Sequence, residues 1–188
     1  MNVWRLGVAG LPLTAYAATA VAEMIVGDPL PTLRGEFLTG QTVVLPQAAD
    51  GRVTLLLLGF TYDSRFAVEA WAQRFRDLFH TDPRATFYEI PMIGGLARMG
   101  KWFIDSGMRR GTPKEDLEHV ITVYGGTGRW KQRVGFRDPK VAYLILLDAS
   151  GRVAWLYAGS LNEQACHALS SEVLRLCGAG GSACQPSS

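Results

Sequence analysis

The chain has 188 residues, 48% of them hydrophobic, which is enough for one domain with a sizeable core. Its 19 basic and 17 acidic residues give a net charge of +2, too near zero for intrinsic disorder or a general nucleic-acid binder. Three cysteines are too few for a fold built on disulfides. These values exclude classes of protein but do not indicate a function.

The first 22 residues differ from the rest of the chain. One cation, Arg5, precedes an uncharged, alanine-rich stretch that ends in Ala20-Val21-Ala22, which fits the small-x-small rule of signal peptidase. We expect residues 1–22 to be a signal peptide or a membrane anchor. The protein would then be exported, either periplasmic or tethered to the inner membrane and facing the periplasm. The alternatives are a mitochondrial presequence, with the protein at the mitochondrial inner membrane, and an ordinary buried segment.

A hairpin, a core strand and a helix are predicted next. Thr39-Gly40 is a turn signal between strands at Arg34–Leu38 and Gln41–Leu45. Val53–Leu58 is apolar without alternation, as in a strand buried on both faces. Ser64–His80 has a helical period. The apolar face of this helix is expected to contain Phe66, Val68, Trp71, Phe75, Leu78 and Phe79.

The middle of the chain predicts a second core strand at Ala85–Met92 and a helix over Gly95–Met108. Thr112-Pro113 has the capping residue and the first-turn proline of a further helix. A strand at Val120–Tyr124 and a short helix at Thr127–Val134 are expected to follow.

The last third predicts a hairpin and a closing helix. Val141–Leu147 is a continuous apolar strand, Val153–Ala158 is its hairpin partner, and Leu161–Leu176 is an amphipathic helix. Parallel strands with helical crossovers, followed by this antiparallel hairpin, predict a three-layer α/β sandwich with a central mixed sheet and helices on both faces. The domain would span residues 23–176, and residues 177–188 would form a flexible Gly/Ser-rich tail.

This order of elements resembles the thioredoxin fold. The strand at Val53–Phe60 leading into a helix at Ser64 is similar to the central strand and first helix of that superfamily. Pro139 before an apolar strand is similar to the superfamily's cis-proline segment. Gly59-Phe60-Thr61 is similar to the corresponding entry of Sco-type copper chaperones and thioredoxin-like peroxidases, and the chain is more distantly similar to TlpA-type proteins.

From about residue 31 to 176 the chain resembles the mitochondrial ATP-synthase assembly factors, which assist the membrane (Fo) sector. The features that carry this resemblance are Gly40-x-x-Val43-x-Leu45, Trp71, the stretch 104–110 before Gly111-Thr112-Pro113, and 142–148 leading into 151–155 and Gly159. The resemblance implies a thioredoxin-like fold and a protein client, with a membrane subunit of ATP synthase as the implied partner.

Redox chemistry at the usual thioredoxin position is not expected. That chemistry needs a thiolate at the start of the first helix, where the helix dipole lowers the cysteine pKa. Here the position is Thr61-Tyr62-Asp63-Ser64, and the first cysteine in the chain is Cys166. Hydroxyl and carboxylate groups do not exchange disulfides or bind copper(I) as paired thiolates do. No cofactor is therefore expected. Asp63 and Ser64 either cap the helix or form, with Pro139, a pocket for an extended peptide.

The three cysteines lie late in the chain. Cys166 and Cys177 are about 16 Å apart if they share one helix, too far for a bond. Cys184, in the tail, could pair with either; a Cys177–Cys184 disulfide and free cysteines both remain open. A metal site that also used His167 would lack the close paired spacing of zinc sites, so none is expected. A divergent thiol oxidoreductase or peroxidase using these cysteines is the alternative function.

A basic region extends from Arg98 to Lys140, with ten basic and five acidic residues. Interleaved aromatic residues could make it a surface for an acidic protein face or for anionic lipid headgroups. The other interpretation is an ordinary solvated face whose aromatic residues point inward, and no nucleic-acid partner is expected. We therefore predict a redox-inactive thioredoxin-like assembly factor or chaperone for a membrane complex. The client-contact residues expected are Thr61, Tyr62, Asp63, Ser64, Pro139, Arg109, Arg110, Trp102 and Trp130.

Overall fold

The computed structural model describes residues 21–94 and 100–178, with the side chains of Trp102 and Phe103 excepted. Nearly all of the expected signal or anchor segment therefore lies outside the described residues. The same holds for the tail after residue 178, including Cys184, and for the beginning of the helix expected at Gly95.

In the described part of the chain, seven strands form one mixed sheet in the order β2-β1-β5-β4-β3-β6-β7. The strands β3, β4 and β5 are parallel, and each remaining pair of neighbours is antiparallel. The mixed sheet confirms the predicted fold class, and a strand lies at every predicted position. The strands are β1 Leu33–Phe37, β2 Thr42–Leu45, β3 Val53–Gly59, β4 Ala85–Ile93, β5 Ile121–Tyr124, β6 Ala142–Leu147 and β7 Val153–Gly159.

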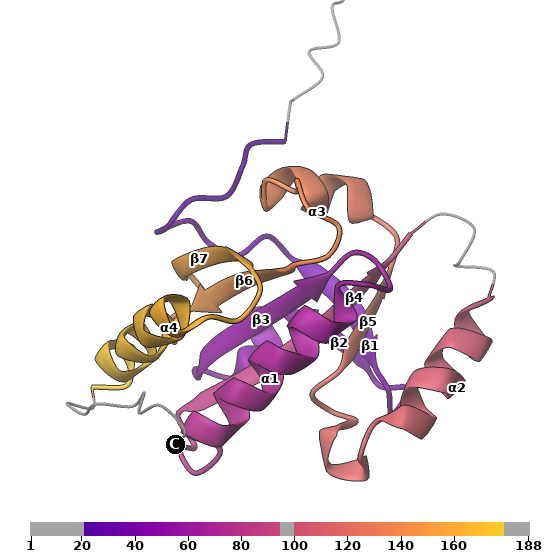
Figure 1. Ribbon diagram of the computed structural model, residues 1–188, viewed down its shortest axis with the longest axis horizontal. Helices are drawn as coiled ribbons and strands as arrows, with labels where there is room; N and C mark the ends of the chain where they lie inside the picture. Colours follow the sequence, from indigo (N-terminus) through magenta and orange to yellow (C-terminus); the bar gives the residue numbers. More distant parts are fainter. Residues whose placement is uncertain (1–20, 95–99, 179–188) are drawn as a thin grey trace, which may run out of the picture.

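Helices lie on both faces of this sheet (Figure 1). α1 and α4 cover one face and share an apolar cluster with the strands, while Trp130 of α3 and the segment before β1 pack on the other. Figure 1 shows α2 beside α1, over the β1 and β5 side of the sheet. The helices are α1 Arg65–Phe79, α2 Lys101–Gly111, α3 Thr127–Arg133 and α4 Glu163–Leu176, with 3-10 turns at Gln47–Ala49 and Lys114–Asp116.

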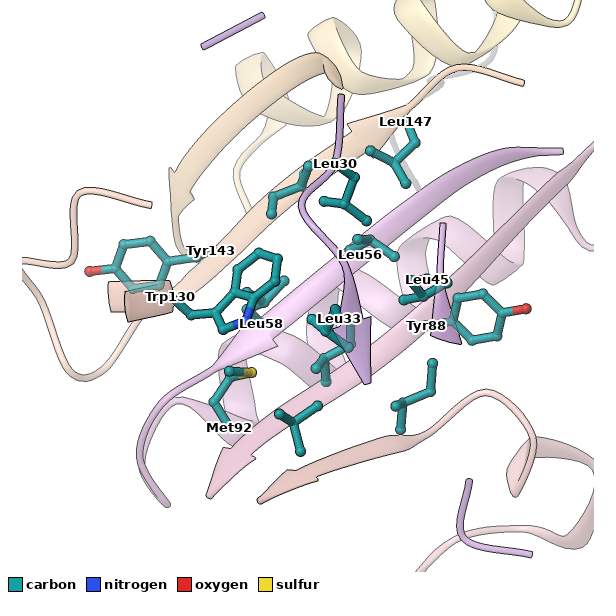
Figure 2. Close-up of a cluster of buried hydrophobic side chains, with 14 of the residues drawn as sticks. Leu30, Leu33, Leu45, Leu56, Leu58, Tyr88, Met92, Trp130, Tyr143 and Leu147 are labelled. Atoms are coloured by element: carbon teal, nitrogen blue, oxygen red, sulfur yellow. The ribbon is translucent and has the colours of Figure 1, made fainter. Parts of the chain in front are cut away.

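The central strand β3 explains why the core has two halves. Every residue of β3 is buried, and successive side chains point to opposite faces. Leu55 and Leu57 face the cluster under α1 and α4, whereas Leu56 and Leu58 face the cluster that contains Trp130 (Figure 2). A continuous apolar run is what this two-sided burial requires.

The segment before β1 belongs to the fold. Met24 and Leu30 are buried in the apolar cluster that contains Trp130, and Figure 2 shows Leu30 within it. The Met24 N–H donates to Arg133 O at 2.8 Å, and the Gly27 N–H donates to Val153 O at 2.8 Å. These bonds fasten residues 24–30 to α3 and β7.

Two sequence expectations differ from the structure. No α-helix begins at Thr112-Pro113, because Pro113 is extended (ψ 150°) and precedes only a 3-10 turn. Phe66 does not join the apolar face of α1; its side chain is 60% exposed. Among the described helices, none is both long enough and apolar enough to cross a bilayer.

Candidate functional site

The loop at the start of α1 is closed by hydroxyl groups. The Thr61 N–H donates to Ser64 Oγ at 3.2 Å, and Ser64 Oγ donates to Thr61 O at 2.8 Å. The Ser64 N–H in turn donates to Thr61 Oγ1 at 3.2 Å. Ser64 is 1% exposed, and a Cβ added to Gly59 would lie 2.9 Å from its Oγ. Because Gly59 has no side chain, there is room for the Ser64 hydroxyl to be buried against it.

The expectation that Asp63 or Ser64 caps α1 is wrong. Ser64 makes no side-chain cap bond to α1, and Asp63 is exposed. Two side-chain oxygens accept backbone N–H groups here, Thr61 Oγ1 from Ser64 and Ser64 Oγ from Thr61, and both N–H groups precede the first residue of α1.

Pro139 lies beside this loop, as expected, although its peptide bond is not the cis bond implied by the resemblance. Thr61 Oγ1 donates a short hydrogen bond to Pro139 O. In the described chain the cis peptide bond is Leu45–Pro46. The Tyr143 hydroxyl holds the loop before Pro139 in place. It accepts a hydrogen bond from the Asp138 N–H and donates one to Asp138 O, both at 3.0 Å.

Two aromatic side chains project from this end of α1. Tyr62 is 74% exposed and Phe66 is 60% exposed. The Arg65 guanidinium lies between them, 3.8 Å from the centroid of the Tyr62 ring and 4.4 Å from that of Phe66. Such contacts hold the exposed rings in place beside the loop.

A groove of about 670 Å³ opens next to these rings, between α1 and α2. Its walls are mostly apolar, and its floor is the end of β3 and the middle of β4. The crevice at the carboxyl ends of parallel strands is the usual place for a ligand site in an α/β sheet. The lining residues are Gly59, Thr61, Tyr62, Ser64, Arg65, Phe66, Val68, Glu69, Glu89, Pro91, Ile104, Gly107, Met108, Gly111, Thr112 and Val120.

Glu89 of β4 contributes a carboxyl group to the floor of this groove. Burial raises its pKa to about 7; Glu69 and Asp116 add to the rise, and Arg76 opposes it. Within the described chain, no hydrogen bond or ion pair engages this carboxyl group. Sequence reasoning missed Glu89, although one acidic residue inside the apolar run Ala85–Met92 was a signal that could have identified it.

The expected basic and aromatic contacts are only partly brought together. Trp130 is 5% exposed and belongs to the core, so it offers no surface to a client. The Nε of Arg109 donates to Leu38 O at 2.8 Å, on a side of α2 that does not line the groove. Arg110 is exposed, and the side chain of Trp102 lies outside the described residues. Of the described client-contact residues expected from the sequence, Thr61, Tyr62 and Ser64 line the groove, whereas the others do not: Asp63, Arg109, Arg110, Trp130 and Pro139.

The described cysteines do not line the groove. Cys166 is buried in the cluster beneath α1 and α4. Cys177 is partly buried, its carbonyl accepts from Arg84 Nη1 at 2.6 Å, and burial raises the pKa of its thiol. A raised pKa lowers the thiolate fraction, which is the opposite of what a reactive cysteine needs. Among the described residues, no three His, Cys, Asp or Glu side chains are placed to hold a metal ion.

Solved structures share this arrangement of strands and helices over most of their length. A protein assigned as thiol:disulfide interchange protein DsbE of Chlorobium tepidum superposes with a TM-score of 0.57 and 17% identity, covering 82% of this chain and 99% of its own. The fold is thioredoxin-like. In this fold the loop at 61–64 lies at the start of the first helix after the central strand. The resemblance to thioredoxins predicts that a redox-active member would have its cysteine at this position, and this chain has none there.

Two further structures have the same fold. The exposed lipoprotein thioredoxin Etrx1 of Streptococcus pneumoniae matches with a TM-score of 0.53 and 11% identity, over 78% of this chain and all (100%) of its own. BsSco, of the Sco family of cytochrome c oxidase assembly proteins, matches with a TM-score of 0.52 and 13% identity, over 79% and 97%. No protein-family model matches the sequence. Nor is any curated protein matched. Identities this low establish the thioredoxin-like fold alone.

Proposed function

We propose that this protein is a redox-inactive thioredoxin-like assembly factor that binds a protein client non-covalently during construction of a membrane complex. The observation that supports this most is the loop at 61–64, where a thiol enzyme would need sulfur and this chain has the hydroxyl groups of Thr61 and Ser64, each hydrogen-bonded to the backbone of the other residue. The loop borders a 670 Å³ groove and two exposed aromatic rings. Exposed aromatic side chains beside an apolar groove are typical of protein-binding sites.

The client class and the location belong to the same proposal. The resemblance to ATP-synthase assembly factors makes a membrane subunit of the Fo sector the first client to examine. The apolar segment before Glu23 supports an exported or membrane-tethered protein. The similarly folded BsSco belongs to a family of cytochrome c oxidase assembly proteins, and Etrx1 is an exposed lipoprotein.

Site-specific crosslinking in membranes tests this function. A photoreactive amino acid placed at Phe66 should crosslink to one or a few subunits of a membrane complex, identified by mass spectrometry. The matched control is the same amino acid at Ala168, which is exposed on α4 and does not line the groove. Equal capture of the same proteins from both positions would contradict the proposal.

The alternative, a thiol oxidoreductase or peroxidase using the C-terminal cysteines, makes a different prediction. The thioredoxin-like proteins that match include a thiol:disulfide interchange protein, so the activity has to be measured. We expect the full chain to show no insulin reduction and no peroxide consumption above the level of the Cys166→Ser, Cys177→Ser, Cys184→Ser triple variant. Activity that this variant lacks would replace the binding function with the enzymatic one.

A further inference from the structure

The charged residues around the groove indicate which kind of client segment the groove binds, and this inference rests on the proposed function. The apolar walls come from both helices: Val68 and Phe66 from α1, Ile104 and Met108 from α2. These residues suit an apolar segment. The floor, however, contains the carboxyl group of Glu89, and a purely apolar occupant would leave that group buried without a partner.

The basic groups of the described chain nearest Glu89 are already engaged elsewhere. Arg76 Nη2 lies 3.0 Å from Asp116 Oδ2, and Arg65 stacks between two aromatic rings. α2 contributes Ile104, Gly107, Met108 and Gly111 to the lining, none of which is charged. Among the described residues, the charged ones that line the groove are Arg65, Glu69 and Glu89, so together they carry a net negative charge when both acids are ionised.

We propose that the groove binds an apolar client segment carrying one lysine or arginine, whose cation pairs with the carboxylate of Glu89. The cation supplies the partner that the described chain does not, and the apolar side chains on either side of it contact the two helices. An ion pair shielded from water by apolar walls is stronger than the same pair at an exposed surface.

Affinity should then depend on pH. The groups facing Glu89 are Glu69 and Arg76 on α1 and Asp116 in the 3-10 turn. Burial and the two acids favour the protonated form of Glu89, and a bound cation favours the ionised form. Binding therefore releases a proton at pH values below the pKa, and affinity for the cationic segment rises as pH increases from about 6 to about 8.

Fluorescence anisotropy with two labelled peptides and the purified full-length chain tests this inference. One peptide is apolar with a single central lysine, and the other has norleucine in place of the lysine. At about pH 8 the lysine peptide should bind at least about tenfold more tightly to the wild type. Glu89→Gln should abolish the difference, Glu89→Asp should restore part of it, and Glu69→Gln, which alters an exposed carboxylate at the groove, should retain most of it.

Failure of the inference and failure of the proposed function give different results. If both peptides bind the wild type equally, and Phe66→Ala weakens both, the groove is a client site without a preference for cations and the inference is wrong. If Glu89→Gln keeps the tenfold difference, the cation is recognised elsewhere and the inference is also wrong. If neither peptide binds and Phe66 yields no specific crosslink in membranes, the proposed function fails along with it.

Discussion

Glu89 places an ionisable group in a strand whose neighbouring residues are largely buried and apolar. Its pKa of about 7, compared with 4.5 for an ordinary glutamate, means that the folded protein holds the proton more tightly than the unfolded chain does. Folding stability therefore falls as pH rises through the window from about 4.5 to about 7. Above that window the full cost of the partly buried charge is present, and below it the cost is absent.

Glu89→Gln should remove this cost. Between about pH 4 and about pH 8 the wild type should lose roughly 3 kcal/mol more unfolding free energy than the variant, because each pKa unit corresponds to about 1.4 kcal/mol. Urea unfolding of the full chain at a series of pH values measures the difference, in which groups common to both proteins cancel. Glu69→Gln is the control and should retain most of the wild-type pH dependence, because burial raises the pKa of Glu89 more than the charge of Glu69 does. Parallel curves for wild type and Glu89→Gln would show that the carboxyl group is not buried as described.

Some single residues could be predicted from the sequence and others could not. The sequence alone shows that residues 61–64 contain no cysteine. The outward position of Phe66 could not be predicted from the sequence. Helical spacing assigns Phe66 to the apolar face, whereas the groove beside α1 leaves that side of the helix uncovered. Trp130 shows the converse, since a tryptophan between Arg129 and Lys131 suggests a surface but lies in the core.

At the scale of elements, α2 is held differently from α1. α1 buries six side chains, whereas none of the side chains described for α2 is buried. Among the side chains described for α2, polar contacts join the helix to the sheet. Lys101 Nζ lies 2.8 Å from Glu36 Oε2 and 2.7 Å from Asp105 Oδ2, and the Tyr124 hydroxyl donates to Asp105 Oδ1 at 2.6 Å. Partly exposed ion pairs contribute less to stability than buried apolar area does.

We expect α2 to open locally without unfolding of the domain. Native-state hydrogen exchange should show the amides of α2 exchanging at least about tenfold faster than those of α1. Asp105→Ala removes the contacts to both Lys101 and Tyr124, so it should accelerate exchange in α2 further. Asp77→Ala is the matched control, since Asp77 accepts a hydrogen bond from Gln73 on the exposed side of α1. Equal protection of α1 and α2 in the wild type would contradict this account.

Strands were easier to predict than the connections between them. A short, continuous apolar run such as Val53–Leu58 is typical of a strand that is buried on both faces of a sheet. The presence and position of such strands can therefore be predicted from the sequence. Thr112-Pro113 has the composition of a helix start, yet only seven residues lie between Pro113 and the first residue of β5 at Ile121, and a 3-10 turn occupies part of them. Helix propensity is a local property of the residues, so it does not take into account how short this connection is.

For the whole molecule, the order of elements was sufficient to predict the layers, but not the full sheet order. The hairpin β1–β2 joins the sheet through β5, a strand more than 80 residues away in sequence, with Glu36 opposite Thr122. No periodicity within either strand specifies that pairing. The groove depends on it indirectly, because the β1–β5 side of the sheet carries α2, and α2 forms the second wall.

The outer boundary of the fold is set by the segment that precedes β1. Met24 and Leu30, at 6% and 5% exposure, complete the cluster on the α3 face. Backbone bonds from the Leu30 N–H to Gly151 O (3.1 Å) and from the Val153 N–H to Asp28 O (2.8 Å) hold the segment against the β6–β7 turn. A domain that begins near residue 24 therefore leaves almost no free linker between its core and the apolar N-terminal stretch.

Leu30→Ala in the full chain should lower the free energy of unfolding by about 3 kcal/mol, because it removes buried methyl groups and leaves a cavity next to β3. Ile25→Ala is the matched control: it lies in the same segment with 64% of its side chain exposed, and its effect should stay within about 0.5 kcal/mol. Denaturant unfolding measures both variants. If Leu30→Ala costs no more than Ile25→Ala, residues 24–30 do not belong to the folded unit. The predicted difference would instead show that residues 24–30 belong to the folded unit and are held to α3 and β7.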